Sequence, residues 1–264
     1  MSDTPSKEDE LAGTEQPFVQ HLVELRDRMV KAFIAIGVAA AILFFFPGPG
    51  ALYDFLAAPL VAHLPKGATL IATSVISPFM VPLKILLMSA FLLALPFVLW
   101  QVWAFVAPGL YSHEKKLVLP LVISSTLLFF IGVAFCYYLV FGQVFAFIQS
   151  FAPKSITAAP DIEAYLSFVL SMFLAFGLSF EVPIAVVVLA RMGVVSIEKL
   201  RGFRGYFIVI AFVIAAIVTP PDVVSQLSLA IPMCILYQVG IWAAQIFIKH
   251  TKAPEDVQET ATHS

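Results

Sequence analysis

The sequence predicts an all-α integral membrane protein with six transmembrane helices, and two observations lead to this prediction. The 264-residue chain is 61% hydrophobic and 12% charged, whereas soluble domains are typically about 45–50% apolar and about 25% charged. Six apolar runs also follow one another along the chain, and most approach the length of about 20 residues that crosses a bilayer. The composition excludes a soluble domain, and the net charge of −2 gives no indication of a nucleic-acid partner.

The N-terminal region predicts a tail followed by a surface helix. Residues 1–16 are polar and acidic, lack the basic start and apolar run of a signal peptide, and are expected to be disordered. From residue 17 to 29, apolar side chains recur at helical spacing with charged residues between them. This pattern is typical of an amphipathic helix on a membrane surface. We expect the membrane domain over residues 17–250 and a second tail over 251–264.

The six apolar runs differ in length, and their limits are 29–46, 78–106, 117–148, 165–190, 205–218 and 223–248. The fifth would reach only about 21 Å as a helix, and Pro232 is expected to break the sixth near its start. Only Thr219-Pro-Pro-Asp222 separates these two runs. The sequence thus predicts a short fifth and sixth helix joined by a tight turn, with local thinning of the bilayer around them.

The basic residues predict the orientation in the membrane. Six spans place both termini on one side, and twelve of the fifteen Lys and Arg residues fall on that side. Only Lys66, Lys84 and Lys154 fall on or near the other side. Because cytoplasmic segments are rich in Lys and Arg, both termini are expected in the cytoplasm.

The sequence predicts neither an enzyme nor a cofactor or metal site. The histidines lie in predicted tails, loops or the surface helix, so no base stands beside a nucleophile within the membrane. Cys136 and Cys234 lie inside apolar runs and are interpreted as small buried side chains. Glycine-rich phosphate loops and the motifs of zinc proteases and serine hydrolases are absent.

Acidic residues are the candidate functional groups. Glu181 lies well inside the fourth run, where an ionisable side chain is costly unless it is paired or hydrated. It is either a functional group or a structural carboxyl that bonds a neighbouring helix. Asp222 is either functional or the N-cap of the sixth helix, and Thr219 and Gln226 complete a polar group at the periplasmic end of that turn.

Glu24 and Glu114 are predicted on the cytoplasmic side. Each alone is typical of a solvated surface charge. Together they place two carboxylates on a membrane face that is otherwise rich in positive charge, an arrangement that could receive a basic peptide.

Four motifs occur in order from the surface helix to the last span. They are His21-Leu-Val-Glu-Leu-Arg26, Gln101-Val-Trp-Ala-Phe-Val-Ala-Pro-Gly-Leu-Tyr111 running into His113-Glu-Lys-Lys116, Phe176-Gly-Leu-Ser-Phe-Glu-Val-Pro183, and Thr219-Pro-Pro-Asp-Val-Val-Ser-Gln226. With these motifs the chain resembles TatC, the multispanning subunit of the twin-arginine (Sec-independent) protein translocase.

The resemblance implies a function in the export of folded proteins. TatC-like proteins form a concave helical bundle in the bacterial inner membrane, receive twin-arginine signal peptides, self-associate, and assemble with single-span TatA/TatB-type subunits. Export is driven by the proton motive force. By position, Glu24 and Glu114 would bind the arginine pair, and Phe105 would line the same site.

The resemblance also implies roles for residues elsewhere in the chain. Glu181 would face the concave, lipid-open side, and Thr219 and Gln226 would dock a partner helix. Asp222 and Pro59 would be functional on the periplasmic side.

Two other function classes stay open. A proton- or ion-coupled transporter of small solutes would use Glu181, although no internal repeat supports it. A passive membrane scaffold would need neither cytoplasmic acid.

Overall fold

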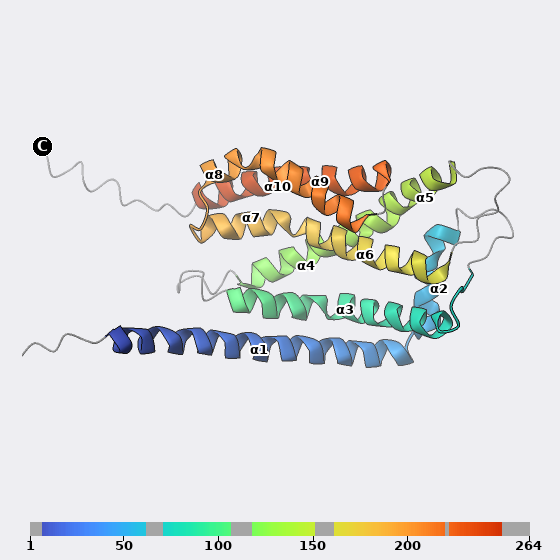
Figure 1. Cartoon of the computed structure of the whole chain (residues 1–264), viewed down its shortest axis with the longest axis horizontal. Helices are drawn as coiled ribbons and strands as arrows, with labels where there is room; N and C mark the ends of the chain where they lie inside the picture. Colours follow the sequence, from blue (N-terminus) through green and yellow to red (C-terminus); the bar gives the residue numbers. More distant parts are fainter. Residues whose placement is uncertain (1–6, 62–70, 107–117, 151–160, 220–221, 250–264) are drawn as a thin grey trace, which may run out of the picture. The chain divides into compact units, whose positions relative to one another are not determined.

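The computed structural model describes residues 7–61, 71–106, 118–150, 161–219 and 222–249. Within these ranges the chain is helical throughout its regular structure, apart from one isolated bridge between Ile71 and Asp161. Five helical segments are long and apolar enough to cross a membrane, and the helix Arg204–Val218 is a shorter apolar one. The predicted all-α membrane class is therefore confirmed. The helices fall into two compact units, residues 1–53 with 82–123 and residues 54–81 with 124–264, and each is described by itself (Figure 1).

The first unit contains α1 (Lys7–Phe45) and most of α3 (Ser77–Val106). The two helices run side by side in Figure 1 and meet through a buried cluster of small side chains, Ala39, Ala90 and Ala94. Alanine at such a seam lets two helix backbones approach closely, which is typical of helix packing in membranes. Helix α1 begins at Lys7, within the predicted acidic tail, so the surface helix and the first span form one continuous helix.

The second unit holds the fourth predicted span and the third from residue 124 onward. The third comprises α4 (Val118–Phe135), one π-helical segment, η3 (Cys136–Val140), and α5 (Phe141–Ser150). The fourth comprises α6 (Ile162–Phe180) and α7 (Val182–Arg191), which Glu181 separates. Gly132 and Gly177 allow α4 and α6 to pack closely, because a Cβ atom at either glycine would overlap the opposite helix.

The fifth and sixth predicted spans are α9 (Arg204–Val218) and α10 (Val223–Lys249), preceded by the short α8 (Ile197–Gly202). Helix α9 has 15 residues, so it is short as predicted. Helix α10 has 27 residues with Pro232 inside it, so the predictions of a break and of a short sixth helix were wrong. Proline removes one helical N–H, but packing against neighbouring helices sustains such helices in membranes, and α10 packs against α7 and α9.

Helix α2 (Pro49–Val61) lies between α1 and α3 in the sequence. Its second half belongs to the same unit as η3 and α6, and two tyrosine hydroxyl groups from those elements bond its backbone. The segment between the first two predicted spans is therefore largely helical where the structure describes it.

Candidate functional site

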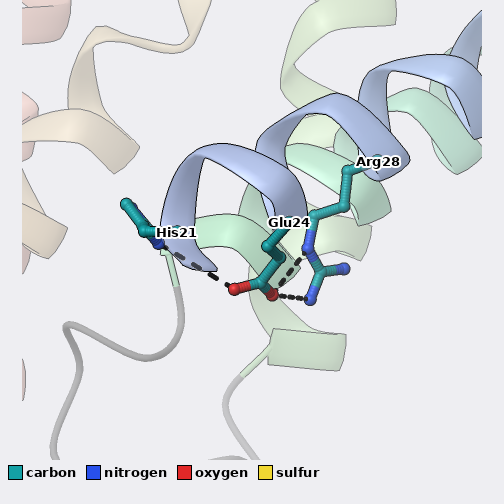
Figure 2. A network of polar contacts seen from close by, with 3 residues as sticks. All are labelled: His21, Glu24 and Arg28. Carbon is teal, nitrogen blue, oxygen red and sulfur yellow. Dashed lines mark hydrogen bonds and ion pairs between the residues drawn. The ribbon is translucent and has the colours of Figure 1, made fainter. Parts of the chain in front are cut away.

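The N-terminal part of α1 carries a small polar cluster around Glu24 (Figure 2). Arg28, one turn further along the helix, donates two hydrogen bonds to the same carboxylate oxygen, Oε1, from Nε at 3.0 Å and from Nη2 at 2.6 Å. The second oxygen, Oε2, lies 3.9 Å from His21 Nδ1, which is beyond hydrogen-bond distance. One oxygen of Glu24 is therefore held by a guanidinium, and the other faces an imidazole.

Phe105 on α3 approaches the same turn of α1. Its ring stacks on His21 with a centroid distance of 4.2 Å and an interplanar angle of 16°. Through His21, the structure thus places Phe105 near Glu24, although the two residues are 81 positions apart (105 − 24). Glu114, the other predicted carboxylate, lies outside the described residues.

Exposure differs among the charged side chains of this cluster. The Glu24 side chain is 35% exposed and that of Arg28 is 24% exposed, whereas Arg26, which pairs with Asp27, is 70% exposed. Exposed ion pairs contribute only about 0–1 kcal/mol each. Partial shielding makes Glu24–Arg28 the stronger of the two pairs on physical grounds. Sequence reasoning did not single out Arg28, although Glu and Arg spaced by four residues is a known helical pairing signal.

Glu181 occupies the junction of α6 and α7. Pro183 follows two residues later, and because proline has no backbone N–H to continue the helix, α6 ends before Glu181. The Glu181 carboxyl shares a hydrogen bond with Ser125 of α4, while its Oε1 atom is buried without a partner among the described residues. The bond to Ser125 is the contact that a carboxyl bonding a neighbouring helix would make, which is one of the two interpretations of the sequence.

The turn between α9 and α10 places its three predicted polar residues in separate interactions. Asp222 Oδ1 accepts the Ser225 N–H at 2.7 Å, so Asp222 is an N-cap of α10, as one interpretation of the sequence predicted. Thr219 donates to Ala215 O of its own helix at 2.8 Å. Gln226 Nε2 lies 3.4 Å from Phe212 O and links α10 to α9.

Pro59 lies within α2, four residues after Phe55. In a regular helix the carbonyl group of residue 55 would accept the N–H of residue 59, which proline lacks. Tyr137 of η3 donates to the Phe55 carbonyl oxygen at 2.8 Å, and Tyr165 of α6 donates to the Leu56 carbonyl oxygen at 2.9 Å. Sequence reasoning missed both tyrosines.

Asp161 joins the start of α6 to the segment before α3. Its Oδ1 atom accepts the N–H groups of Glu163 and Ala164 as an N-cap. Its Oδ2 atom accepts the Thr73 hydroxyl at 2.6 Å and the Thr73 N–H at 3.1 Å. The Thr73 hydroxyl, followed by the backbone N–H donors, lowers the pKa of Asp161 to about 2. Sequence reasoning missed this contact because 88 residues separate its partners.

These features define a class of protein. The described residues form a polytopic helical membrane protein, and within them no three histidine, cysteine or acidic side chains gather as a metal site would require. The partly shielded cluster on α1 combines the carboxylate of Glu24, the guanidinium of Arg28 and the stacked rings of His21 and Phe105.

Known proteins identify the family within this class. The family described as "Sec-independent protein translocase protein (TatC)" matches residues 20–232. The chain is 53% identical over 232 residues to the TatC protein of Halothiobacillus neapolitanus, covering 88% of this chain and 63% of that protein. It is 47% identical over 233 residues to the TatC protein of Escherichia coli K12, covering 88% and 90% respectively.

A solved structure agrees with this assignment. A crystal structure described as the twin arginine translocase receptor TatC is 40% identical to this chain, with a TM-score of 0.75 over 86% of this chain and 98% of the other. The chain belongs to the TatC family, a membrane component of the Sec-independent protein translocase that works with other subunits of that complex.

Proposed function

We propose that this chain is the signal-peptide receptor and core subunit of the twin-arginine translocase. It binds the twin-arginine signal peptides of folded preproteins and organises partner subunits for their export. One observation supports this function above others: the Glu24 carboxylate, partly exposed on α1, already accepts paired N–H groups from a guanidinium. A surface that binds an internal arginine in this way has the chemistry to bind an arginine of a signal peptide.

The choice of arginine over lysine follows from the shape of the donor. A guanidinium is planar and presents several N–H groups in a fixed arrangement, whereas an ammonium is a point charge. We assign Glu24 and Glu114 as the two acceptors and Phe105 as an aromatic wall. The His21–Phe105 stack supports this assignment, because it brings an apolar ring next to the turn that carries Glu24.

We assign the docking of partner subunits to the C-terminal helices α9 and α10. We propose that single-span TatA/TatB-type helices dock beside Thr219 and Gln226. The outer side of α9 is available to such a helix, since Tyr206, Val209 and Ile217 are all strongly exposed. Self-association of this chain would complete the receptor complex.

The remaining assignments follow from orientation. We propose that the chain lies in the bacterial inner membrane with both termini in the cytoplasm, which places Asp222 and Pro59 on the periplasmic side. Glu181 would be the intramembrane polar group on the lipid-open side. Its bond to Ser125 favours helix packing over the alternative use as the ion carrier of a solute transporter.

Crosslinking tests the receptor site. A twin-arginine precursor carrying a photoreactive group beside its arginine pair is incubated with membranes containing the wild-type chain, Glu24→Gln, Glu114→Gln or both. Each single variant should lower the crosslinked fraction several-fold and the double variant should abolish it. Asp27→Asn, which removes an exposed acid from the same helix, should leave crosslinking unchanged. Full crosslinking in the double variant would contradict the assigned site.

A further inference from the structure

We propose that Arg28 is an internal ligand of Glu24 that an incoming arginine must displace. The inference rests on the proposed function, because it concerns how Glu24 is made available to a signal peptide. Arg28 makes two contacts to Oε1 of Glu24, and Figure 2 shows its guanidinium directed at that carboxylate. In the unliganded chain the acceptor is therefore already occupied.

While Arg28 holds Oε1, an incoming guanidinium cannot pair with both carboxylate oxygens of Glu24. A planar guanidinium binds a carboxylate most strongly when two parallel N–H groups meet its two oxygens. Oε1 is held by Arg28, and only Oε2, near His21, is free of a hydrogen bond to that guanidinium. A signal arginine can reach both oxygens only after Arg28 moves away.

Displacement sets a threshold that depends on the chemistry of the incoming group. A signal arginine replaces one guanidinium by another, so the bonds lost and gained at Glu24 are of the same kind. A lysine offers an ammonium without the planar fork, so its contact does not match the one that Arg28 gives up. Arg28 therefore lowers the affinity for any cation and prevents lysine from gaining by contact with Glu24.

Two other roles for Arg28 make different predictions. If Arg28 only oriented the Glu24 carboxylate, its removal would weaken peptide binding. If Arg28 acted only as a positive charge that repels a basic peptide, removing any nearby positive charge would strengthen binding equally, and Arg28→Lys would have no effect. Lys31, exposed on the same helix three residues further on, provides the matched charge control.

The experiment measures binding of fluorescent twin-arginine and twin-lysine signal peptides to the full chain in lipid nanodiscs. Arg28→Gln should bind the twin-arginine peptide about two- to fivefold more tightly than wild type, the range that an ion pair worth up to about 1 kcal/mol allows. Arg28→Lys keeps the charge but loses the fork, and should also bind more tightly than wild type. Lys31→Gln should change affinity less than Arg28→Gln does.

Salt dependence provides a second measurement. In wild type, binding at Glu24 exchanges one ion pair for another, whereas in Arg28→Gln it creates a new pair. The affinity of Arg28→Gln should therefore fall more steeply with salt concentration than that of wild type or of Lys31→Gln. The twin-lysine peptide should gain affinity in Arg28→Gln, and lose that gain when Glu24→Gln is added.

The outcomes separate this proposal from the proposed function. Unchanged or weaker binding in Arg28→Lys, or equal effects of Arg28→Gln and Lys31→Gln, would overturn the displacement of Arg28. If Glu24→Gln bound the twin-arginine peptide as well as wild type, the proposed receptor site itself would fail. Should Arg28→Gln not fold, Arg28→Lys alone decides the question, because it preserves the charge of the helix.

Discussion

Three carboxylates of this chain have different roles because different donors surround them. Glu24 faces a guanidinium on its own helix and an imidazole. Asp222 caps α10 by accepting a backbone N–H. Asp161 caps α6 and at the same time accepts two hydrogen bonds from Thr73. The Glu24 and Asp222 contacts lie within four residues and are accessible to sequence reasoning, whereas the Thr73 contact arises only when the chain folds.

The Asp161 contacts predict a pH-dependent stability. Hydrogen bonds lower the pKa of Asp161 from its ordinary value of 3.8 to about 2 in the folded chain. A lowered pKa contributes stability that is fully present above the ordinary value and is lost as pH falls toward 2. Thermal unfolding of the detergent-solubilised chain should show a melting temperature that drops between about pH 4 and pH 2 for this reason.

Two variants isolate this contribution. Asp161→Asn should melt at a lower temperature than wild type at neutral pH and should lose part of the acid-dependent drop. Thr73→Val removes the hydroxyl donor but keeps the N-cap. Its dependence of melting temperature on pH should therefore fall between those of wild type and Asp161→Asn. An acid-dependent drop in Asp161→Asn equal to that of wild type would contradict the assignment.

At the scale of elements, backbone chemistry links α2 to η3 and α6. Pro59 leaves the carbonyl group of Phe55 without its helical donor, and Tyr137 supplies a hydroxyl in its place. The rings of Tyr137 and Phe55 also stack, with centroids 5.2 Å apart and an interplanar angle of 9°. A proline that frees a carbonyl and a tyrosine that binds it form a connection between segments 82 residues apart.

This connection predicts a non-additive pair of substitutions. Tyr137→Phe should lower the free energy of unfolding by about 0.5–1.5 kcal/mol, the usual net value of one hydrogen bond. In a Pro59→Ala background the loss should be smaller, because the substituted residue would again supply a helical N–H to the Phe55 carbonyl. Denaturation curves of the four chains in a double-mutant cycle measure the difference.

The neighbouring residue provides the control for this cycle. Tyr138 is 73% exposed, and Tyr138→Phe should leave stability nearly unchanged. If Tyr137→Phe lowered the free energy of unfolding equally with and without Pro59, the proline would not govern the contact.

Glycines at helix crossings predict a second effect at this scale. A Cβ atom at Gly240 of α10 would lie 2.8 Å from the Cα atom of Pro183 in α7, so Gly240→Ala should force the helices apart. Overpacking of this kind typically costs about 1–3 kcal/mol. Gly142→Ala, where nothing lies within 4 Å of the added atom, should be neutral or slightly stabilising. Comparable destabilisation of both variants in a thermal denaturation assay would refute the crossing as the cause.

At the scale of the whole molecule, most helices present large apolar side chains outward, as a bilayer requires. Helix α9 is the exception in length, because 15 residues extend only about 22 Å against a hydrocarbon core of about 30 Å. The apolar length of α9 therefore matches a thinner hydrocarbon core than the apolar length of the other spans does. A short span is accommodated by thinning the lipid around it, at a modest cost in free energy.

Bilayer thickness should consequently affect stability. The chain reconstituted in dimyristoylphosphatidylcholine should unfold at a higher temperature than in dioleoylphosphatidylcholine, whose hydrocarbon core is thicker. A variant in which four leucines extend α9 after Val218 should lose or reverse this preference. Identical melting temperatures of wild type in the two lipids would contradict a mismatch at α9.

Composition and periodicity determined the membrane class and the shortness of the fifth predicted span, because these depend on residue type and local spacing alone. They failed at Pro232, where the local cost of a proline was outweighed by packing of α10 against α7 and α9. The tertiary structure alone decided that Phe105 reaches His21, that Ser125 bonds Glu181 and that Tyr137 holds α2. Such contacts join residues far apart in the chain, so they depend on which helix faces meet, and that is a property of packing rather than of any local sequence pattern.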